Sequence, residues 1–295
     1  MTLLNWITKR LPLRRKRKRR SKATWIAART AVQEVVERPE PATGPIVVAK
    51  EEFEVFVRGK GFDFLDFGCS SGGSIKWAKK VLGGRRGLGI DIDRAKVETA
   101  RAAGCDAILF DILDIPPTKL VDFTLLKHFL EHVPDTLRAA KFIRRACEVS
   151  REFVLIKQPY FDADGLLFQK GLKLYWSHWR GHPYTMTSLN LYCVLSDLRQ
   201  SGEIQEFSIH NLGPIVSSDD PAIHPIDSPI DQHGYDAAQH PRKRKNVPLD
   251  FPLFRETVAI AWIDGGSGRD ILGGLKGPTL VYDTSGTPNA RGKRN

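Results

Sequence analysis

The chain has 295 residues, of which 41% are hydrophobic and 27% are charged, and its formal net charge is +11. This length and composition are typical of a globular protein with a sizeable core, and they exclude a fibrous or wholly disordered chain. No run of 18 or more apolar residues occurs, so we predict no membrane-spanning helix.

The positive charge is concentrated near the N-terminus. Ten Lys and Arg residues and no acidic residue lie between Lys9 and Lys22, which leaves a balance of +1 for the rest of the chain. We predict a basic arm and linker over residues 1–50, with a helix at 23–36. Phosphate binding, attachment to an anionic membrane and targeting all remain open for residues 9–22, although Trp6 and its neighbouring leucines favour the membrane surface.

The cysteines and the N-terminal pattern bear on location. The four cysteines lie far apart and form no C-x-x-C pair, which is typical of reduced thiols inside a cell. A secretory signal places its charge before a long apolar stretch, whereas here a short apolar piece precedes the charge. We therefore predict a cytoplasmic protein, and attachment to the membrane surface through the arm is one of the three open alternatives for residues 9–22.

From Phe62 onward, segments with strand and helix patterns alternate along the chain. We predict strands at 62–67, 87–91, 106–110, 122–126, 153–156 and 257–263, and helices at 74–82, 94–103, 136–150 and 188–201. Such alternation is typical of a parallel sheet with crossover helices. The fold class predicted is therefore α/β, with a Rossmann-like, doubly wound and mostly parallel sheet.

Two segments interrupt the predicted domain, which spans residues 51–264. The first, residues 160–186, is rich in aromatic and histidine side chains. The second, residues 213–252, is too long for an ordinary connection, so we expect a lid, a binding loop or disorder there. Glycine is frequent after Asp264, and we expect a disordered tail over residues 265–295.

The densest functional signal is the segment F-L-D-F-G-C-S-S-G-G-S, which begins at Phe64. A strand that ends in a glycine turn and leads into a helix places backbone N–H groups at a crevice, which favours a nucleotide-like ligand. Asp91 follows Gly68 by 23 residues, close to the separation at which such folds bind a ribose. The dinucleotide fingerprint G-x-G-x-x-G is not met, and Asp66 suits a cationic sulfonium amino acid better than a pyrophosphate.

The segment resembles the glycine motif D-x-G-x-G-x-G of class I S-adenosylmethionine-dependent methyltransferases, with Ser70 in place of the second glycine. The resemblance covers residues 62–160 and reaches F-L-E-H-V at Phe129, which is similar to the L-E-H-V signature of the small-molecule and glycan branch. It implies S-adenosylmethionine as the cofactor. The cofactor-binding residues that it implies are Asp66, Gly68, Cys69, Ser70, Gly72, Asp91, Ile92, Asp111, Ile112 and Lys127.

The resemblance also implies roles for single residues, each of which has a structural alternative. Asp91 would bind the ribose, Asp111 the adenine amino group, and Gly68 would lie beneath the methionine part. Alternatively, Asp91 caps the following helix, although Asp93 is better placed to do so, and Asp111 caps a turn. Glu131 and His132 can likewise be structural hydrogen-bonding partners.

The predicted catalytic residues are two histidines just beyond the fourth strand. A hydroxyl must lose its proton during attack, and His132 and His128 are placed to act as the base. The aromatic segment 160–184 is the predicted acceptor wall, with aromatic packing as the alternative. His178 and His182 have metal-ligand spacing, but Gly181 and Pro183 argue against a continuous helix there, and no metal is predicted.

These patterns together predict an enzyme that O-methylates a small-molecule or glycan hydroxyl. Nucleic acid is a less favoured acceptor, because the folded part carries a balance of only +1. Two further alternatives are a non-catalytic nucleotide-binding module and an NAD-dependent enzyme.

Overall fold

The computed structural model describes residues 46–264 and 269–285. The predicted basic arm and the helix at 23–36 lie outside these residues, as does the end of the predicted tail. Among the described residues, no helix is long and apolar enough to cross a membrane.

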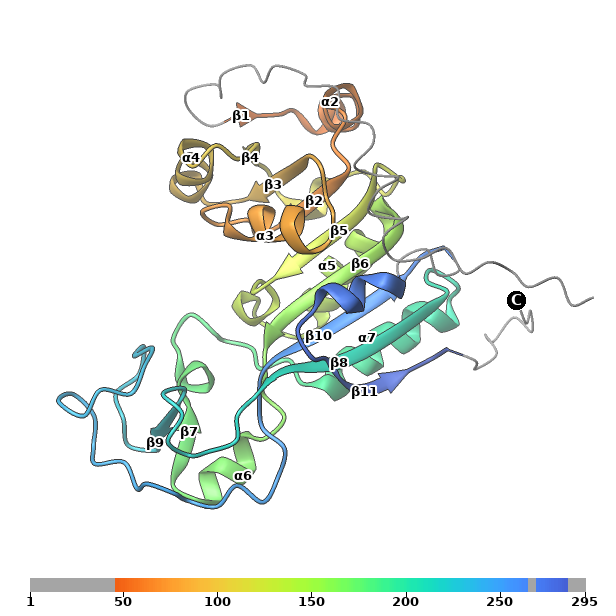
Figure 1. Cartoon of the computed structure of the whole chain (residues 1–295). Coiled ribbons are helices and arrows are strands. Elements are labelled where there is room, and N and C mark those ends of the chain that lie inside the picture. The colour runs from red at the N-terminus through yellow and green to blue at the C-terminus, as the bar shows by residue number, and fades with distance from the viewer. Residues whose placement is uncertain (1–45, 265–268, 286–295) are drawn as a thin grey trace, which may run out of the picture. The chain divides into compact units, whose positions relative to one another are not determined.

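The centre of the described structure is a nine-stranded sheet (Figure 1). Six neighbouring strands run parallel, in the spatial order β1 (Ile46–Val47), β4 (Ala107–Leu109), β3 (Gly87–Asp91), β2 (Phe64–Phe67), β5 (Val121–Lys127) and β6 (Ser150–Pro159). Three antiparallel strands continue the sheet, in the order β10 (Phe254–Trp262), β8 (Glu206–Pro214) and β11 (Thr279–Asp283). The predicted Rossmann-like, mostly parallel α/β fold is confirmed.

Helices cover both faces of this sheet. The apolar side chains of one face form a core with α2 (Phe53–Lys60), α5 (Thr136–Val149) and α7 (Ser188–Gln200). Those of the other face pack with α3 (Gly73–Val81), α4 (Arg94–Ala102) and the 3₁₀ helix η5 (Arg269–Gly274). On this second face the rings of Phe64, Phe123 and Phe153 stack across three adjacent strands at centroid distances of 4.8 Å. The doubly wound arrangement therefore follows from strands that are apolar on both faces.

The second predicted insertion is not a separate loop. Strand β7 (Leu172–Leu174) pairs antiparallel with β9 (Ile223–Pro225), which joins residues 160–186 to residues 213–252. With α6 (Asp164–Gln169) these segments enclose an apolar cluster of their own, which contains Tyr160 and Trp176. Because β6 ends at Pro159, this paired insertion begins at the edge where the parallel strands have their carboxyl ends.

Part of the predicted tail differs from expectation. Residues 279–283 form β11, which pairs with β8, and residues 269–274 form η5. The run Thr279-Leu280-Val281-Tyr282 is rich in β-branched and aromatic residues, which suit a strand despite the glycines before it. The tail therefore completes the antiparallel side of the sheet.

Candidate cofactor and acceptor site

The loop between β2 and α3 is bent by three residues in the left-handed backbone region. Gly68 has φ of 70°, Ser70 of 47° and Gly72 of 81°. The N–H groups of Gly68 and Cys69 both donate to the carbonyl of Ile90, at 2.9 and 3.2 Å, and so turn the loop toward β3. Ser70 therefore adopts the conformation for which glycine is preferred, which costs a non-glycine residue about 1–2 kcal/mol.

The glycines of this region make room for protein side chains. A Cβ on Gly68 would overlap the Phe129 ring, and one on Gly72 would lie 2.6 Å from Sγ of Cys105. Cys69 is itself buried against Gly89 of β3. The space over the Gly68 Cα is thus held by Phe129 and not left open for a ligand.

Asp66 is a fully buried carboxylate beneath the loop. Its Oδ2 accepts a hydrogen bond from Ser74 Oγ at 2.5 Å, whereas its buried Oδ1 has no partner among the described residues. Burial raises the pKa of Asp66 to about 7, even though the Ser74 hydrogen bond and the charge of Lys127 lower it. A buried acceptor without a donor fits the amino group of a cationic ligand.

Asp91 ends β3 in a position that suits a ribose. Its Oδ2 accepts from Ser70 N–H and its Oδ1 from Asp93 N–H, both at 3.0 Å, and each oxygen retains a lone pair. Asp93, not Asp91, caps α4, because it accepts from the N–H groups of Ala95 and Lys96. The next residue after Asp91, Ile92, is 74% exposed and offers an apolar surface beside the carboxylate.

The carboxylate that follows β4 has a different arrangement from Asp91 at the end of β3. Asp111 accepts from Leu113 N–H at 2.9 Å and caps the 3₁₀ helix η2 (Ile112–Asp114), which is its structural alternative. The side chain of Ile112 is buried in the apolar core, so it does not face a ligand. Asp111 itself remains exposed and accessible to one.

His128 follows β5 and lies between two carboxylates. Its Nε2 is 3.0 Å from Oε1 of Glu256, and its Nδ1 is 3.3 Å from Oε1 of Glu131. Burial alone would lower the pKa of His128, but the hydrogen bonds to Glu131 and Glu256 raise it above its ordinary value. Both ring nitrogens therefore face acceptors, which leaves no lone pair for a substrate proton. Lys127 precedes it, and burial together with Lys157 lowers the pKa of Lys127.

His132 has one ring nitrogen free. It ends the 3₁₀ helix η3 (Leu130–His132), and its Nδ1 is 2.6 Å from the carbonyl oxygen of Gly181. A carbonyl can only accept, so Nδ1 carries the proton and Nε2 keeps its lone pair. The insertion thus selects the tautomer of an exposed imidazole that can take up a proton.

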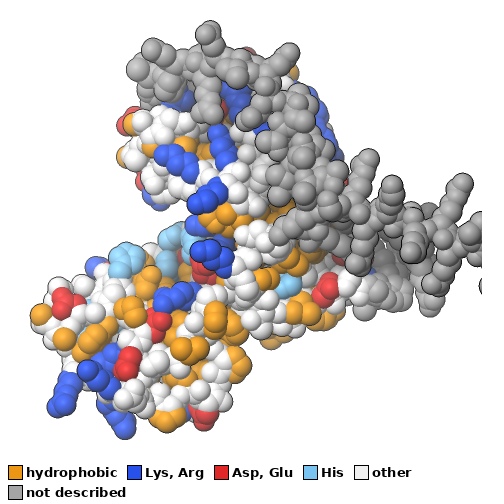
Figure 2. Space-filling view, in the orientation of Figure 1, with side chains coloured by type: hydrophobic (Ala, Val, Ile, Leu, Met, Phe, Trp, Pro, Cys, Tyr) orange, Lys and Arg blue, Asp and Glu red, His pale blue; other side chains and the backbone are white. Residues whose placement is uncertain are grey.

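His182 of the insertion lies beside His132. The two rings are 5.1 Å apart between centroids, and Nδ1 of His182 is 2.9 Å from the carbonyl oxygen of Trp176. The buried carboxylate of Glu131 belongs to the same cluster. Figure 2 shows histidine side chains along the upper edge of the lower lobe, where the surface is hollowed.

The predicted acceptor wall is only partly available. Tyr160 and Trp176 are buried in the core of the insertion, where Trp176 Nε1 donates to the Tyr160 carbonyl at 2.8 Å. These two side chains therefore pack in the core, which is the alternative to the acceptor wall given above. Trp179 and Tyr184 remain partly exposed, and Tyr184 Oη is 2.7 Å from Thr136 Oγ1 of α5. Of the predicted wall, the segment 179–184 therefore keeps aromatic side chains that are partly exposed.

The sequence did not point to Glu256 or Lys157 as members of this site, whereas it placed His182 within the predicted acceptor wall. Glu256 opens β10, where its Oε2 is 2.5 Å from Nζ of Lys157. No motif marks it, because its position depends on an antiparallel strand whose place in the sheet cannot be derived from the sequence. For His182, the aromatic and histidine-rich composition of the insertion was the available signal.

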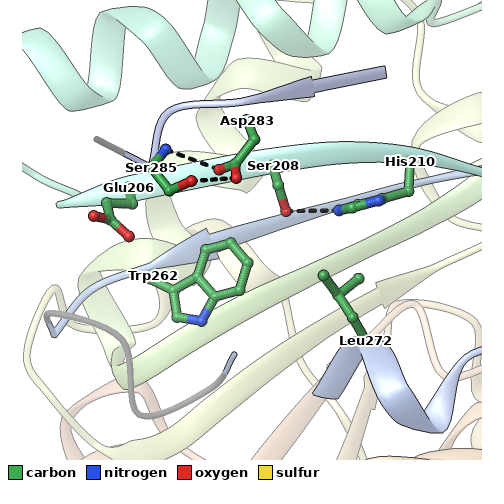
Figure 3. A pocket seen from close by; sticks show the side chains of 7 residues that line it. All are labelled: Glu206, Ser208, His210, Trp262, Leu272, Asp283 and Ser285. Carbon is green, nitrogen blue, oxygen red and sulfur yellow. Dashed lines mark hydrogen bonds between the residues drawn. The ribbon is translucent and has the colours of Figure 1, made fainter. Parts of the chain in front are cut away.

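A pocket on the antiparallel side of the sheet is separate from this cluster (Figure 3). It is lined by Glu206, Ser208, His210, Trp262, Leu272, Asp283 and Ser285. Trp262 pairs with Phe153 near the start of β6, at the opposite edge from the glycine loop. This pocket therefore takes no part in the candidate site.

One protein-family model matches part of the chain. Residues 65–152 match the sequence model of a methyltransferase domain, which runs from β2 into β6. A search of curated proteins finds no match.

Several solved structures are similar to this chain at low sequence identity. A SAM-dependent methyltransferase from Archaeoglobus fulgidus has 16% identity and a TM-score of 0.46, over 72% of this chain and 94% of that one. A second, from Methanosarcina mazei, has 17% identity and a TM-score of 0.41, over 68% and 91%. Magnesium protoporphyrin IX methyltransferase from Synechocystis, solved with bound SAM, has 13% identity and a TM-score of 0.39, over 72% and 77%.

The matched domain supports an S-adenosylmethionine-dependent methyltransferase of class I, with S-adenosylmethionine as the cofactor. The residues present fit that cofactor, because an unpaired buried acceptor on Asp66 and the carboxylate of Asp91 lie at adjacent strand ends. The nicotinamide alternative receives no support from the match.

Proposed function

We propose that this methyltransferase transfers a methyl group to a hydroxyl oxygen of a small-molecule or glycan acceptor. The observation that carries the proposal is His132, whose Nδ1–H is bound by the Gly181 carbonyl while Nε2 stays free beside the insertion. A hydroxyl needs a proton acceptor during its attack, whereas a neutral amine attacks through its own lone pair. A base held in one tautomer is therefore expected of an O-methyltransferase.

The cofactor would be held at the carboxyl ends of β2, β3 and β4. Asp66 is proposed to bind its amino group, Asp91 the ribose hydroxyls and Asp111 the adenine amino group, with Ile92 against the adenine. When bound, S-adenosylmethionine supplies a methyl group on a sulfonium, which is already a strong electrophile. The protein contributes alignment, proton uptake by His132 and a wall that limits the entry of water.

The acceptor would lie against residues 179–184. The partly exposed Trp179 offers an aromatic face, and His182 and Tyr184 offer polar edges on the same segment. An acceptor that combines a ring face with hydroxyl groups fits such a surface, as a sugar or a phenol does.

The basic arm is a separate part of the proposal. We propose that Lys9 to Lys22 attach the enzyme to an anionic membrane surface while Trp6 inserts, which would bring the folded domain near lipid-linked acceptors. The folded domain would carry the chemistry without this arm.

Turnover of a His132→Ala variant tests the proposed base. The full chain is incubated with labelled S-adenosylmethionine and with pools of sugars, lipid-linked glycans, phenols and RNA. We expect label in a hydroxyl acceptor, a fall in kcat of ~10²–10⁴-fold in the variant, and an unchanged Kd for the cofactor by calorimetry. Because His132 is exposed, added imidazole should restore part of the rate.

His128→Ala is the matched control for a histidine whose nitrogens are both engaged. It should alter the site through Glu131 and Glu256 and should not respond to imidazole. Label found only in nitrogen acceptors, with no effect of His132→Ala, would contradict the proposed O-methyl transfer and leave the cofactor assignment standing.

A further inference from the structure

Three potential metal ligands converge at the junction of η3 and the insertion. Glu131, His132 and His182 each place one ligand atom within 4.8 Å of the other two. They come from sequence positions about 50 residues apart, which the backbone joins through a 3.5 Å hydrogen bond from Tyr184 N–H to the Glu131 carbonyl. The cluster is therefore part of the folded junction between sheet and insertion, and not a chance group of surface side chains.

The free atoms of this cluster are all acceptors. Each imidazole donates its Nδ1–H to a backbone carbonyl, of Gly181 for His132 and of Trp176 for His182, so each is left with an Nε2 lone pair. Glu131 is 1% exposed, and its Oε2 has no hydrogen-bond partner in the described part of the chain. Three lone pairs that lie close together with no hydrogen-bond donor between them are stabilised by a cation. A buried carboxylate oxygen without a donor or a cation lowers the stability of the fold.

The surroundings of the three residues also resemble those of metal ligands in general. Metal-bound histidines usually donate their second N–H to a carbonyl or carboxylate, which fixes the ring and its tautomer, and both histidines here do so. Glu131 is oriented in the same way, because His128 contacts its Oε1 and is in turn contacted by Glu256. The ligands are thus oriented before an ion arrives.

We propose that Glu131, His132 and His182 bind one divalent transition-metal cation. Two imidazoles and one carboxylate suit ions such as Zn²⁺, Co²⁺ or Mn²⁺ and leave coordination positions open for oxygen ligands. Ligand atoms about 2.1 Å from a shared ion lie about 3.0–3.4 Å apart, so atoms that are now up to 4.8 Å apart must approach by up to about 1.8 Å, a shift that rotation of the two imidazoles can supply.

The ion changes how the site would treat an acceptor. With the ion bound, Nε2 of His132 is a ligand and no longer a base, and the ion lowers the pKa of a hydroxyl placed on its open position, whose proton then leaves to solvent. This consequence rests on the proposed function, whereas binding of the ion does not. The base role of His132 thus applies to the ion-free chain.

Cobalt binding to the full-length chain tests the proposal without any turnover. The protein is stripped with a chelator and titrated with Co²⁺, whose visible absorption reports nitrogen and oxygen ligands, and Zn²⁺ is then used to displace it. We expect one ion per chain. His182→Ala and Glu131→Gln should each lower the affinity by more than ~100-fold, since the loss of a ligand should exceed the 10–100-fold typical of outer-shell changes.

His233→Ala is the matched control, because His233 is an exposed histidine of the same insertion whose ring packs 4.6 Å from Trp179. It should bind cobalt like the unaltered chain, and retained cofactor binding shows that each variant is folded. Absence of cobalt binding, or equal affinity in His182→Ala and the unaltered chain, overturns the site. A chain that binds cobalt but methylates no hydroxyl would refute only the proposed function.

Discussion

Asp66 combines a stability cost with its proposed role in cofactor binding. Its carboxylate is fully buried, and the single hydrogen bond from Ser74 leaves Oδ1 unpaired among the described residues. Burial raises its pKa to about 7, so above that pH the folded chain holds a charge that its surroundings oppose. A cationic amino group at this point would offset the cost, which is why the same residue can weaken the free protein and strengthen the complex.

The pH dependence of Asp66→Asn follows from this pKa. The folded pKa is raised above the unfolded value near 4, so folding takes up a proton between about pH 4 and pH 7, and the contribution of Asp66 to stability falls as pH rises through that window. We expect Asp66→Asn to raise Tm at pH 8 and to change it little at pH 4. Thermal melts across pH 4–8 check this.

Asp66→Asn should lower the affinity for S-adenosylmethionine, although it raises the stability of the free chain. We expect the affinity of the unaltered chain for S-adenosylmethionine to fall below pH 7, and calorimetry should show that Asp66→Asn weakens binding at pH 8 and removes this fall. Equal affinity of both chains at pH 8 would count against the proposed role of Asp66.

Residues of the cofactor half could be anticipated because they follow one another along a strand and its turn. Local order alone put Asp66 in β2, Asp91 at the end of β3 and Asp93 at the N-cap of α4, which is where the structure has them. The acceptor half depends on contacts between distant segments. Glu256 meets His128 across 128 positions, and His182 meets His132 across 50, so no local pattern could reveal either pair.

At the scale of elements, the packing of β3 against α3 depends on a glycine. A Cβ on Gly89 would lie 2.6 Å from Cys69 Sγ and 2.8 Å from Ile75 Cδ1, both buried. Gly89→Ala should therefore lower the free energy of unfolding by about 1–3 kcal/mol, which is typical of an overpacked core. Urea denaturation measures the change.

Gly59 provides the control for that substitution. It lies in α2, and a Cβ added there would meet nothing within 4 Å, so Gly59→Ala should stabilise the chain by about 0.5–1 kcal/mol. If the two substitutions had effects of the same sign, crowding at Gly89 would not be the cause.

The elements that the sequence did not predict share a physical reason. Strand β8 carries Ser208, His210 and Asn211, which are buried in the sheet but make its sequence look polar. Strand β11 follows a glycine-rich stretch and lies at the edge of the sheet, where Leu280 is 59% exposed. Strands β2 to β6 and β10 were anticipated because their sequences are apolar, whereas β8 and β11 rely on tertiary pairing.

At the scale of the whole molecule, the basic arm and the folded domain should be separable. Deleting residues 1–22 should abolish sedimentation with anionic vesicles and leave the Kd for S-adenosylmethionine unchanged, since each Lys or Arg near such a surface contributes about 1 kcal/mol. Vesicles of neutral lipid serve as the control, and binding should weaken as salt is raised.

Trp6→Ala distinguishes membrane from nucleic acid. If the arm attaches to lipid, this substitution should weaken vesicle binding and leave RNA retention at matched salt unaffected. Retention on RNA that exceeds vesicle binding, with no effect of Trp6→Ala, would assign the arm to phosphate binding instead.

The position of β10 has a consequence for the order in which the chain acquires its structure during synthesis. β10 lies between β6 and β8, yet it is made after both of them. β8 can therefore reach the sheet only once residue 262 has left the ribosome, and until then Phe207 and Ile209 lack the sheet neighbours that bury them. The parallel strands β2 to β6 can pair before β8 is made. β8 then remains unpaired while about 50 further residues are synthesised, and aggregation or binding by a chaperone is most favoured during that interval.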